Sequence, residues 1–219
     1  MNTKPLCGKW TFGLLVIPVL SAILALINHD FAFKAGVAGS GIILLGVFYR
    51  KDIGARKDIW AVIAAFLFSI AGDWFLSNRH GDTTRFIAGI ALFFVAHIGY
   101  LSYALMNGRL NRILTIILLA GYLVFFGLKL YPAIDNRTLM FAVFVYMLIS
   151  CISLGAAGGI KAAPVVKWVY FFGISMVVFS DTIIAFREFT AYDQLSWLIL
   201  PTYYLAQISV TLSLMIRKG

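Results

Sequence analysis

Residues 138–157 read TLMFAVFVYMLISCISLGAA and contain no charged side chain. An α-helix needs about 20 apolar residues to cross the hydrocarbon core of a bilayer. Buried strands and the core helices of soluble proteins rarely offer an uninterrupted apolar run of this length. The run therefore predicts a transmembrane helix, and it makes the lipid bilayer the solvent in which the chain folds.

Seven further apolar runs lie on either side of this one. Together they predict eight spans, at about residues 10–27, 31–49, 59–77, 86–106, 113–130, 138–157, 168–186 and 195–216. Lys4 and Lys9 could open a secretory signal, but the first run is long for one and lacks a small-x-small cleavage site, so we interpret it as a retained helix. Because the connections are short, we predict one all-α domain over 1–219, a polytopic membrane bundle.

The composition agrees with a membrane protein. Of the 219 residues, 62% are hydrophobic and 12% are charged, whereas a soluble domain is about one-quarter charged. The net charge of +9 comes from short basic clusters between apolar runs, which is typical of membrane proteins, so we predict no nucleic-acid partner. Cys7 and Cys151 give no disulfide framework.

The basic clusters also predict the orientation of the bundle. Twelve of the 18 lysines and arginines fall on the side of the two termini, and the other six are Lys34, Arg79, Arg85, Lys129, Arg137 and Arg187. Loops rich in Lys and Arg stay in the cytoplasm. We therefore predict a multi-pass protein of a bacterial inner membrane with both termini in the cytoplasm.

Three ionisable side chains lie well inside the predicted spans: Asp73, Asp181 and His97. A charge at mid-bilayer costs roughly 2.5–3.5 kcal/mol, so such residues are functional candidates, although a hydrogen-bonded carboxyl group can also merely tie helices together. Both aspartates lie about one turn from the outer ends of their spans, and His97 lies about three turns deep. Helical side chains lean toward their own N-terminus, so we expect the three to meet in the outer, periplasmic half.

Further polar residues lie near this level. Tyr100 shares a helix face with His97, as Gln207 does with Tyr203, and Pro201 is expected to kink the last helix. The arginines just beyond the spans suit a cationic rim for a phosphate headgroup, or are ordinary loop charges. The predicted substrate-binding set is Asn78, Arg79, Tyr100, Arg187, Tyr203, Tyr204 and Gln207.

Four short motifs follow one another along the chain: GDWFL at 72–76, HxxY at 97–100, SDTIIA at 180–185 and YYxAQ at 203–207. In this order they resemble the YhhN-like lysoplasmalogenase family of small membrane proteins, over nearly the whole chain. The resemblance implies hydrolysis of the vinyl ether bond of lysoplasmalogens, a class of lysophospholipid, to a fatty aldehyde and a glycerophospho-alcohol. It also implies that the family's acidic positions are Asp73 and Asp181.

The reaction needs what these residues supply. An acid must protonate the β-carbon of the vinyl ether, and water then captures the oxocarbenium ion as a hemiacetal. Glycosidases handle a similar ion with two carboxyl groups, one protonated and one ionised. We predict that Asp73 and Asp181 form this pair in either order, with His97 orienting water or tuning one of them.

Other classes stay open. We predict no cofactor and no metal, because catalytic zinc usually takes three His-rich ligands, yet His97 with both aspartates could form such a set. The same three residues would also suit the proton relay of a transporter. A structural role is the third class. Membrane lipid and the lysophospholipid are the expected partners, and homo-oligomer formation is left open.

Overall fold

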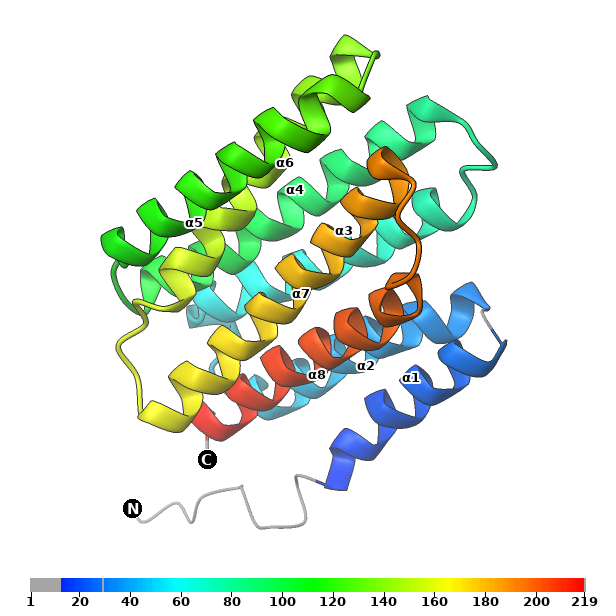
Figure 1. Ribbon diagram of the computed structural model, residues 1–219. Coiled ribbons are helices and arrows are strands. Elements are labelled where there is room, and N and C mark those ends of the chain that lie inside the picture. The colour runs from blue at the N-terminus through cyan, green and yellow to red at the C-terminus, as the bar shows by residue number, and fades with distance from the viewer. Residues whose placement is uncertain (1–12, 29, 219) are drawn as a thin grey trace, which may run out of the picture.

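The computed structural model describes residues 13–28 and 30–218, and in this part of the chain it is a bundle of eight α-helices without β-strands (Figure 1). The helices are α1 (Val16–Asn28), α2 (Phe31–Tyr49), α3 (Lys57–Ser77), α4 (Thr83–Met106), α5 (Arg112–Phe125), α6 (Arg137–Ala157), α7 (Pro164–Thr190) and α8 (Ile199–Lys218). A short π-helical turn, Phe126–Leu130, extends α5. The predicted all-α bundle of about eight helices is confirmed.

Seven helical segments in the described ranges are long and apolar enough to cross a membrane. The chain is therefore an integral multi-pass membrane protein. The remaining helix, α1, has 13 residues. The predicted first span begins at residue 10, outside the described residues.

Polar residues in the short loops begin the helices. Four helices start with an Asp or Asn whose side-chain oxygen accepts a backbone N–H from the first turn, which satisfies a donor that has no partner within the helix. These N-cap residues are Asp30 of α2, Asp82 of α4, Asn111 of α5 and Asn136 of α6. The predicted kink at Pro201 is wrong, because α8 begins at Ile199 and a proline in the first turn breaks no hydrogen bond.

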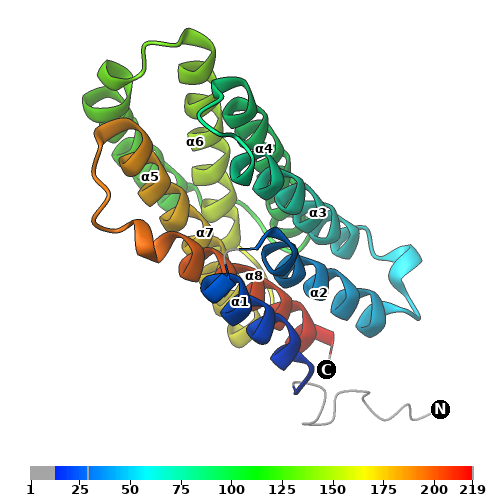
Figure 2. The same ribbon diagram turned by 90° about the vertical axis from the view of Figure 1, so that its right-hand side faces the viewer.

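Six of the helices close into a ring. Going round it, α2 packs on α3, α3 on α4, α4 on α6, α6 on α7, α7 on α8, and α8 again on α2. Outside this ring α1 lies against α2 and α8, and α5 lies against α6, on opposite sides of the bundle in Figure 2. We call the end with the C-terminus the inner end and the opposite end the outer end.

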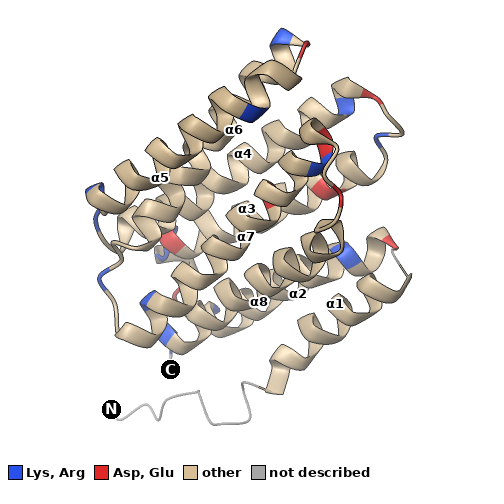
Figure 3. Ribbon diagram, viewed as in Figure 1, with Lys and Arg blue, Asp and Glu red and all other residues tan. Residues whose placement is uncertain are grey.

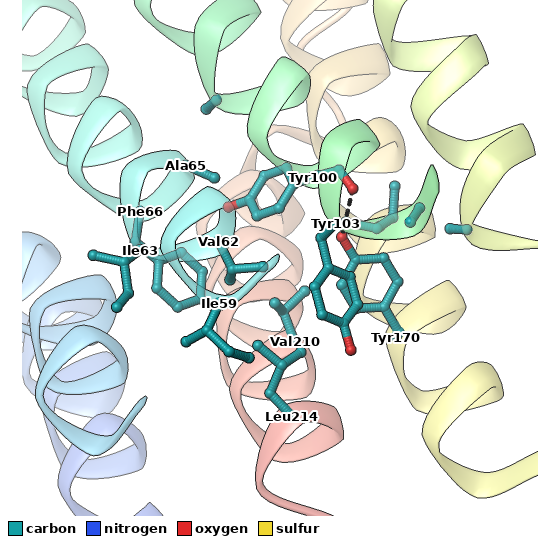
Figure 4. Close-up of a cluster of buried hydrophobic side chains, with 14 of the residues drawn as sticks. Ile59, Val62, Ile63, Ala65, Phe66, Tyr100, Tyr103, Tyr170, Val210 and Leu214 are labelled. Carbon is teal, nitrogen blue, oxygen red and sulfur yellow. Dashed lines mark hydrogen bonds between the residues drawn. The ribbon is translucent and has the colours of Figure 1, made fainter. Parts of the chain in front are cut away.

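Aromatic side chains fill the inner half of the ring. Tyr100, Tyr103 and Tyr170 are buried between α3, α4, α7 and α8, and the hydroxyl of Tyr170 donates to the backbone carbonyl of Tyr100 at 2.8 Å (Figure 4). The ring of Phe66 meets that of Tyr100 edge-on, with centroids 6.3 Å apart. This packing closes the inner half and leaves the intramembrane acids in the outer half.

A charged cluster fastens the inner ends of three helices. Asp58, at the start of α3, accepts two hydrogen bonds from Arg56 at 3.0 Å, one from Arg217 of α8 at 2.7 Å and one from Asn107 after α4 at 3.2 Å. Its side chain is 11% exposed. Figure 3 shows that charged residues gather mostly at the two ends of the bundle, as expected for helices whose middles lie in lipid.

Replacing Gly99 by alanine is expected to destabilise the protein by about 1–3 kcal/mol, as overpacking does elsewhere. A Cβ atom at Gly99 would lie 2.5 Å from the carbonyl oxygen of Ala61 and 2.9 Å from the Cβ of Ala65, so α3 and α4 would have to separate. Thermal unfolding in detergent measures the effect. Gly46→Ala is the matched control, since its Cβ would have no neighbour within 4 Å, and equal melting temperatures for both variants would contradict the prediction.

Candidate active site

Asp181 of α7 receives side chains from two other helices of the ring. The hydroxyl of Tyr146 on α6 donates to Asp181 Oδ2 at 2.6 Å, and His97 Nε2 on α4 lies 3.5 Å from the same oxygen. The imidazole is buried, and it meets the rings of Tyr146 and Tyr100 edge-on at 5.3 and 6.0 Å. Of the expected meeting of three residues, the contact between His97 and Asp181 is confirmed, whereas the hydrogen bond found at Asp73 comes from Tyr203.

Asp73 of α3 is held in a similar way by α8. Its Oδ2 accepts a hydrogen bond of 3.0 Å from the buried hydroxyl of Tyr203. Each of these two carboxyl groups therefore has one phenol donor from another helix of the ring. Such a donor lowers the cost of placing a carboxyl group in a membrane, because a buried polar group without a partner is expensive.

The ring of Phe93 lies close to the surroundings of both carboxyl groups. Its centroid lies 6.0 Å from that of Tyr203, the donor to Asp73, and the same ring lines the pocket beside Asp181. A Cβ atom at Gly72 would come within 2.8 Å of this ring, so the glycine next to Asp73 makes room for it. His97 follows Phe93 by four residues on α4, so the two side chains share a helix face.

A pocket of about 60 Å³ opens beside Asp181. Asp181 and Tyr146 are its polar lining residues. The others are Leu76, Phe86, Ile90, Phe93, Val143, Ile184, Ala185 and Phe189. An apolar wall around a single acid–phenol pair suits a ligand that carries its reacting group on a hydrocarbon chain. The volume admits a few water molecules or a short stretch of chain, so a lipid would have to widen it.

Both predicted rim arginines lie at the outer end, and one carboxylate holds them. Glu188 Oε1 accepts from Arg79 Nη2 at 2.8 Å and from Arg187 Nη2 and Nε at 2.7 and 2.9 Å. The guanidinium of Arg79 also lies over the ring of Phe86, 4.8 Å from its centroid. The two arginines thus gather at the outer end beside the pocket wall, and Glu188 accepts hydrogen bonds from both.

Within the described residues, Tyr203 is the one member of the predicted binding set that hydrogen-bonds to Asp73 or Asp181. The Asn78 amide donates back to the carbonyl of Trp74 at 2.9 Å, so it ends its own helix. Tyr204 packs with Val37 on the side of α1 and α2. The Tyr204 hydroxyl and both amide atoms of Gln207 are buried and have no hydrogen-bond partner among the described residues.

The sequence pattern of the YhhN family matches residues 10–214, almost the whole chain. The chain belongs to the YhhN family. No curated protein and no solved structure gives a significant match. The family assigned from the four motifs is thereby confirmed, and the match covers every helix of the ring that carries Asp73 and Asp181.

Sequence reasoning missed several residues of this YhhN-family site. Tyr146 lies in the middle of an apolar run. A phenol hydroxyl at that depth needs a hydrogen-bond partner, which could have pointed to Asp181, the acceptor that it has. Glu188, the only glutamate of the chain, was left out of the rim although it follows Arg187 directly. The ammonium group of Lys34 reaches the outer end of α3, 3.4 Å from the hydroxyl of Ser77.

The donors of the site do not form a metal-ligand set. Within residues 13–28 and 30–218, no three His, Cys, Asp or Glu side chains come together closely enough to hold a metal ion. His97 contacts Asp181, whereas Asp73 is bonded to Tyr203.

Proposed function

We propose that this YhhN-family protein hydrolyses the vinyl ether bond of a lysoplasmalogen-type lysophospholipid, releasing a fatty aldehyde and a glycerophospho-alcohol. One observation carries the proposal. Two intramembrane carboxyl groups, Asp73 and Asp181, are each held by a phenol inside one ring of helices, and one of them lines an apolar pocket. Acid and base within reach of an alkyl chain are what this hydrolysis needs.

The two hydrogen bonds support a division of roles. The bond from Tyr146 to Asp181, at 2.6 Å, has the length of a bond to an ionised carboxylate, while the bond to Asp73, at 3.0 Å, is at the long end for neutral partners. We assign the proton donor to Asp73 and the ionised carboxylate to Asp181. His97 then holds the Asp181 carboxylate, or its water, in place.

The reaction follows from these roles. Asp73 transfers its proton to the β-carbon, and the double-bond electrons form the new C–H bond, leaving an oxocarbenium ion. Asp181 takes a proton from water while the water oxygen attacks the cationic carbon. The hemiacetal then breaks its C–O bond as its hydroxyl proton passes to the departing alcohol, and a proton returned from Asp181 to Asp73 resets the pair. General acid–base help of this kind is commonly worth about 10²–10⁴ in rate.

The surroundings of the same residues support a proton transporter less well than a hydrolase. A relay across the membrane needs a polar route from the outer acids to the inner end. There the ring is filled by Tyr100, Tyr103 and Tyr170, each 2% exposed or less. The hydrolase also accounts for the apolar pocket beside Asp181, which proton transfer does not require.

An aldehyde-release assay tests the proposal. Purified protein in detergent is given a lysophospholipid with a vinyl ether chain, and in parallel the matched ester and saturated ether lipids. We expect aldehyde from the vinyl ether alone, because only that bond yields an oxocarbenium ion on protonation. Well-folded protein that releases no aldehyde, or that cleaves the ester equally well, contradicts the proposal.

Tyr146→Phe is expected to lower the rate of aldehyde release by about 10-fold, since one hydrogen bond to a charged group is worth about 1.5–3 kcal/mol and only part of it acts in the transition state. The phenol orients Asp181 and does not need to touch the substrate. Tyr122→Phe is the matched control, because its hydroxyl makes an equally short bond, 2.7 Å, to Thr182 instead of a carboxylate. Equal rates for the two variants would remove Tyr146 from the site.

A further inference from the structure

The ion cluster at the outer end has no part in the chemistry above. Glu188 shares its carboxylate between two guanidinium groups, and Arg79 Nη2 lies 2.8 Å from both of its oxygens. The side chains of Glu188, Arg79 and Arg187 are 15%, 28% and 41% exposed, so the acid lies deeper than either base. A partner that enters from outside therefore meets the guanidinium groups first.

The cluster lies next to the wall of the pocket. Arg79 follows α3, the helix of Asp73, and Glu188 lies at the end of α7, the helix of Asp181. Two aromatic residues of the pocket wall adjoin the cluster. The guanidinium of Arg79 lies over the ring of Phe86, and Phe189 follows Glu188 in the chain. These two rings lie 6.2 Å apart. Breaking the Arg79–Glu188 bond would therefore change the contacts beside these two rings of the pocket wall.

The charges of this cluster are not balanced. Two guanidinium groups face one carboxylate, and three N–H donors converge on Oε1, while Oε2 is contacted by Arg79 alone. Guanidinium groups bind phosphate oxygens in bidentate pairs, and a phosphate offers more oxygens than the two of a carboxylate. An anion with more oxygens would satisfy both arginines better than Glu188 does.

We propose that Glu188 is a displaceable counter-ion, and that the phosphate of the lysophospholipid takes its place on Arg79 and Arg187. The exchange frees the α3 and α7 ends from each other and opens the pocket to the lipid chain. For the identity of the lipid this inference rests on the proposed function. The exchange of one anion for another on the two arginines is carried by the geometry alone.

A binding experiment with an inert lipid tests the exchange. The probe is a saturated 1-O-alkyl lysophospholipid, which has no vinyl ether to hydrolyse, and its counterpart is the 1-O-alkylglycerol without phosphate. Dissociation constants are measured on the purified full chain and on Glu188→Gln, Arg79→Gln and Asp82→Asn. The last variant is the matched control, because Asp82 pairs with Arg85 at the same end at 3.7 Å and asparagine still caps α4.

We expect Glu188→Gln to bind the phosphate lipid about 3- to 10-fold more tightly and Arg79→Gln to bind it about 10-fold more weakly, since tenfold corresponds to about 1.4 kcal/mol. The alkylglycerol should gain less affinity in Glu188→Gln than the phosphate lipid does, because it profits only from the weakened tie between α3 and α7. Arg79→Gln should not weaken its binding, and Asp82→Asn should match the wild type for both lipids. Unchanged or weaker binding of the phosphate lipid by Glu188→Gln, with an unchanged melting temperature, would overturn the proposal. A lowered melting temperature together with weaker binding of both lipids would overturn it too, and would make the cluster a structural strap.

Inorganic phosphate separates the two sources of the anion. It should compete with the lipid at least about 100-fold more weakly than the lipid competes with itself, because it leaves the apolar pocket empty. Competition at equal concentration would mean that free phosphate is the ligand and would overturn the lipid assignment. Since the probe is inert, a failed aldehyde assay would leave this result standing, and a failed exchange would leave hydrolysis standing.

Discussion

Asp73→Asn and Asp181→Asn are each expected to lower aldehyde release by about 10²–10⁴-fold, the usual contribution of a general acid or base. Asparagine has nearly the shape of aspartate, and its amide oxygen can still accept the hydrogen bond from Tyr203 or Tyr146. The amide cannot transfer a proton at neutral pH. The fold should therefore persist while the reaction stops, which initial rates and melting temperatures of the purified variants measure together.

The double variant distinguishes a working pair from two independent residues. If one carboxyl group donates the proton and the other activates water, then removing the second after the first should cost little more, because residues that act as a unit are not additive. Asp82→Asn, at the exposed end of the same bundle, should keep the wild-type rate. Full activity in either single variant at position 73 or 181 would rule out the two-carboxylate mechanism.

Asp58→Ala should cause the largest loss of stability. Its carboxylate holds Arg56, Arg217 and Asn107, and its removal leaves two cations facing each other at the inner end. Breaking a fully buried pair costs about 3–5 kcal/mol, and we expect about 2–3 kcal/mol here because the two arginines keep 26% and 28% of their side chains exposed. Thermal unfolding in detergent measures the loss.

Asp52→Ala is the control for this cluster. Asp52 also binds a basic residue of α8, with Lys218 Nζ at 2.7 Å, but it lies at the exposed surface with 37% of its side chain accessible. Water then screens the pair, and exposed pairs contribute little. Its melting temperature should stay near that of the wild type, and an equal loss in both variants would show that burial of Asp58 is not what matters.

The helices could be predicted from the sequence because the bilayer fixes their length. A transmembrane helix cannot be much shorter than about 20 apolar residues. The predicted spans at 31–49 and 138–157 therefore match α2 and α6 closely. The kink predicted at Pro201 was wrong, because a proline bends a helix only when it lies beyond the first turn. A hydropathy pattern does not give the first residue of a helix to within one turn.

From the sequence, contacts within the site could be predicted only where the depth of a residue in the membrane and the direction of its side chain determine them. Those two quantities brought His97 to Asp181, since both follow from position along a helix. The partners Tyr146 and Glu188 depend on which helices are neighbours, and nothing in the sequence says that α6 lies between α4 and α7. Arg79 and Arg187 were placed correctly at the rim, but their common carboxylate is a property of the folded ring.

The most direct test of the central claim is the isotope content of the aldehyde released in deuterated water from the vinyl ether lipid, trapped at once to prevent later exchange. Protonation of the β-carbon by Asp73 with capture of the cation by water predicts one deuterium at carbon 2 of the aldehyde, and product that disappears in Asp73→Asn and Asp181→Asn. Aldehyde without deuterium at that carbon, or no aldehyde from folded wild-type protein, would contradict the account.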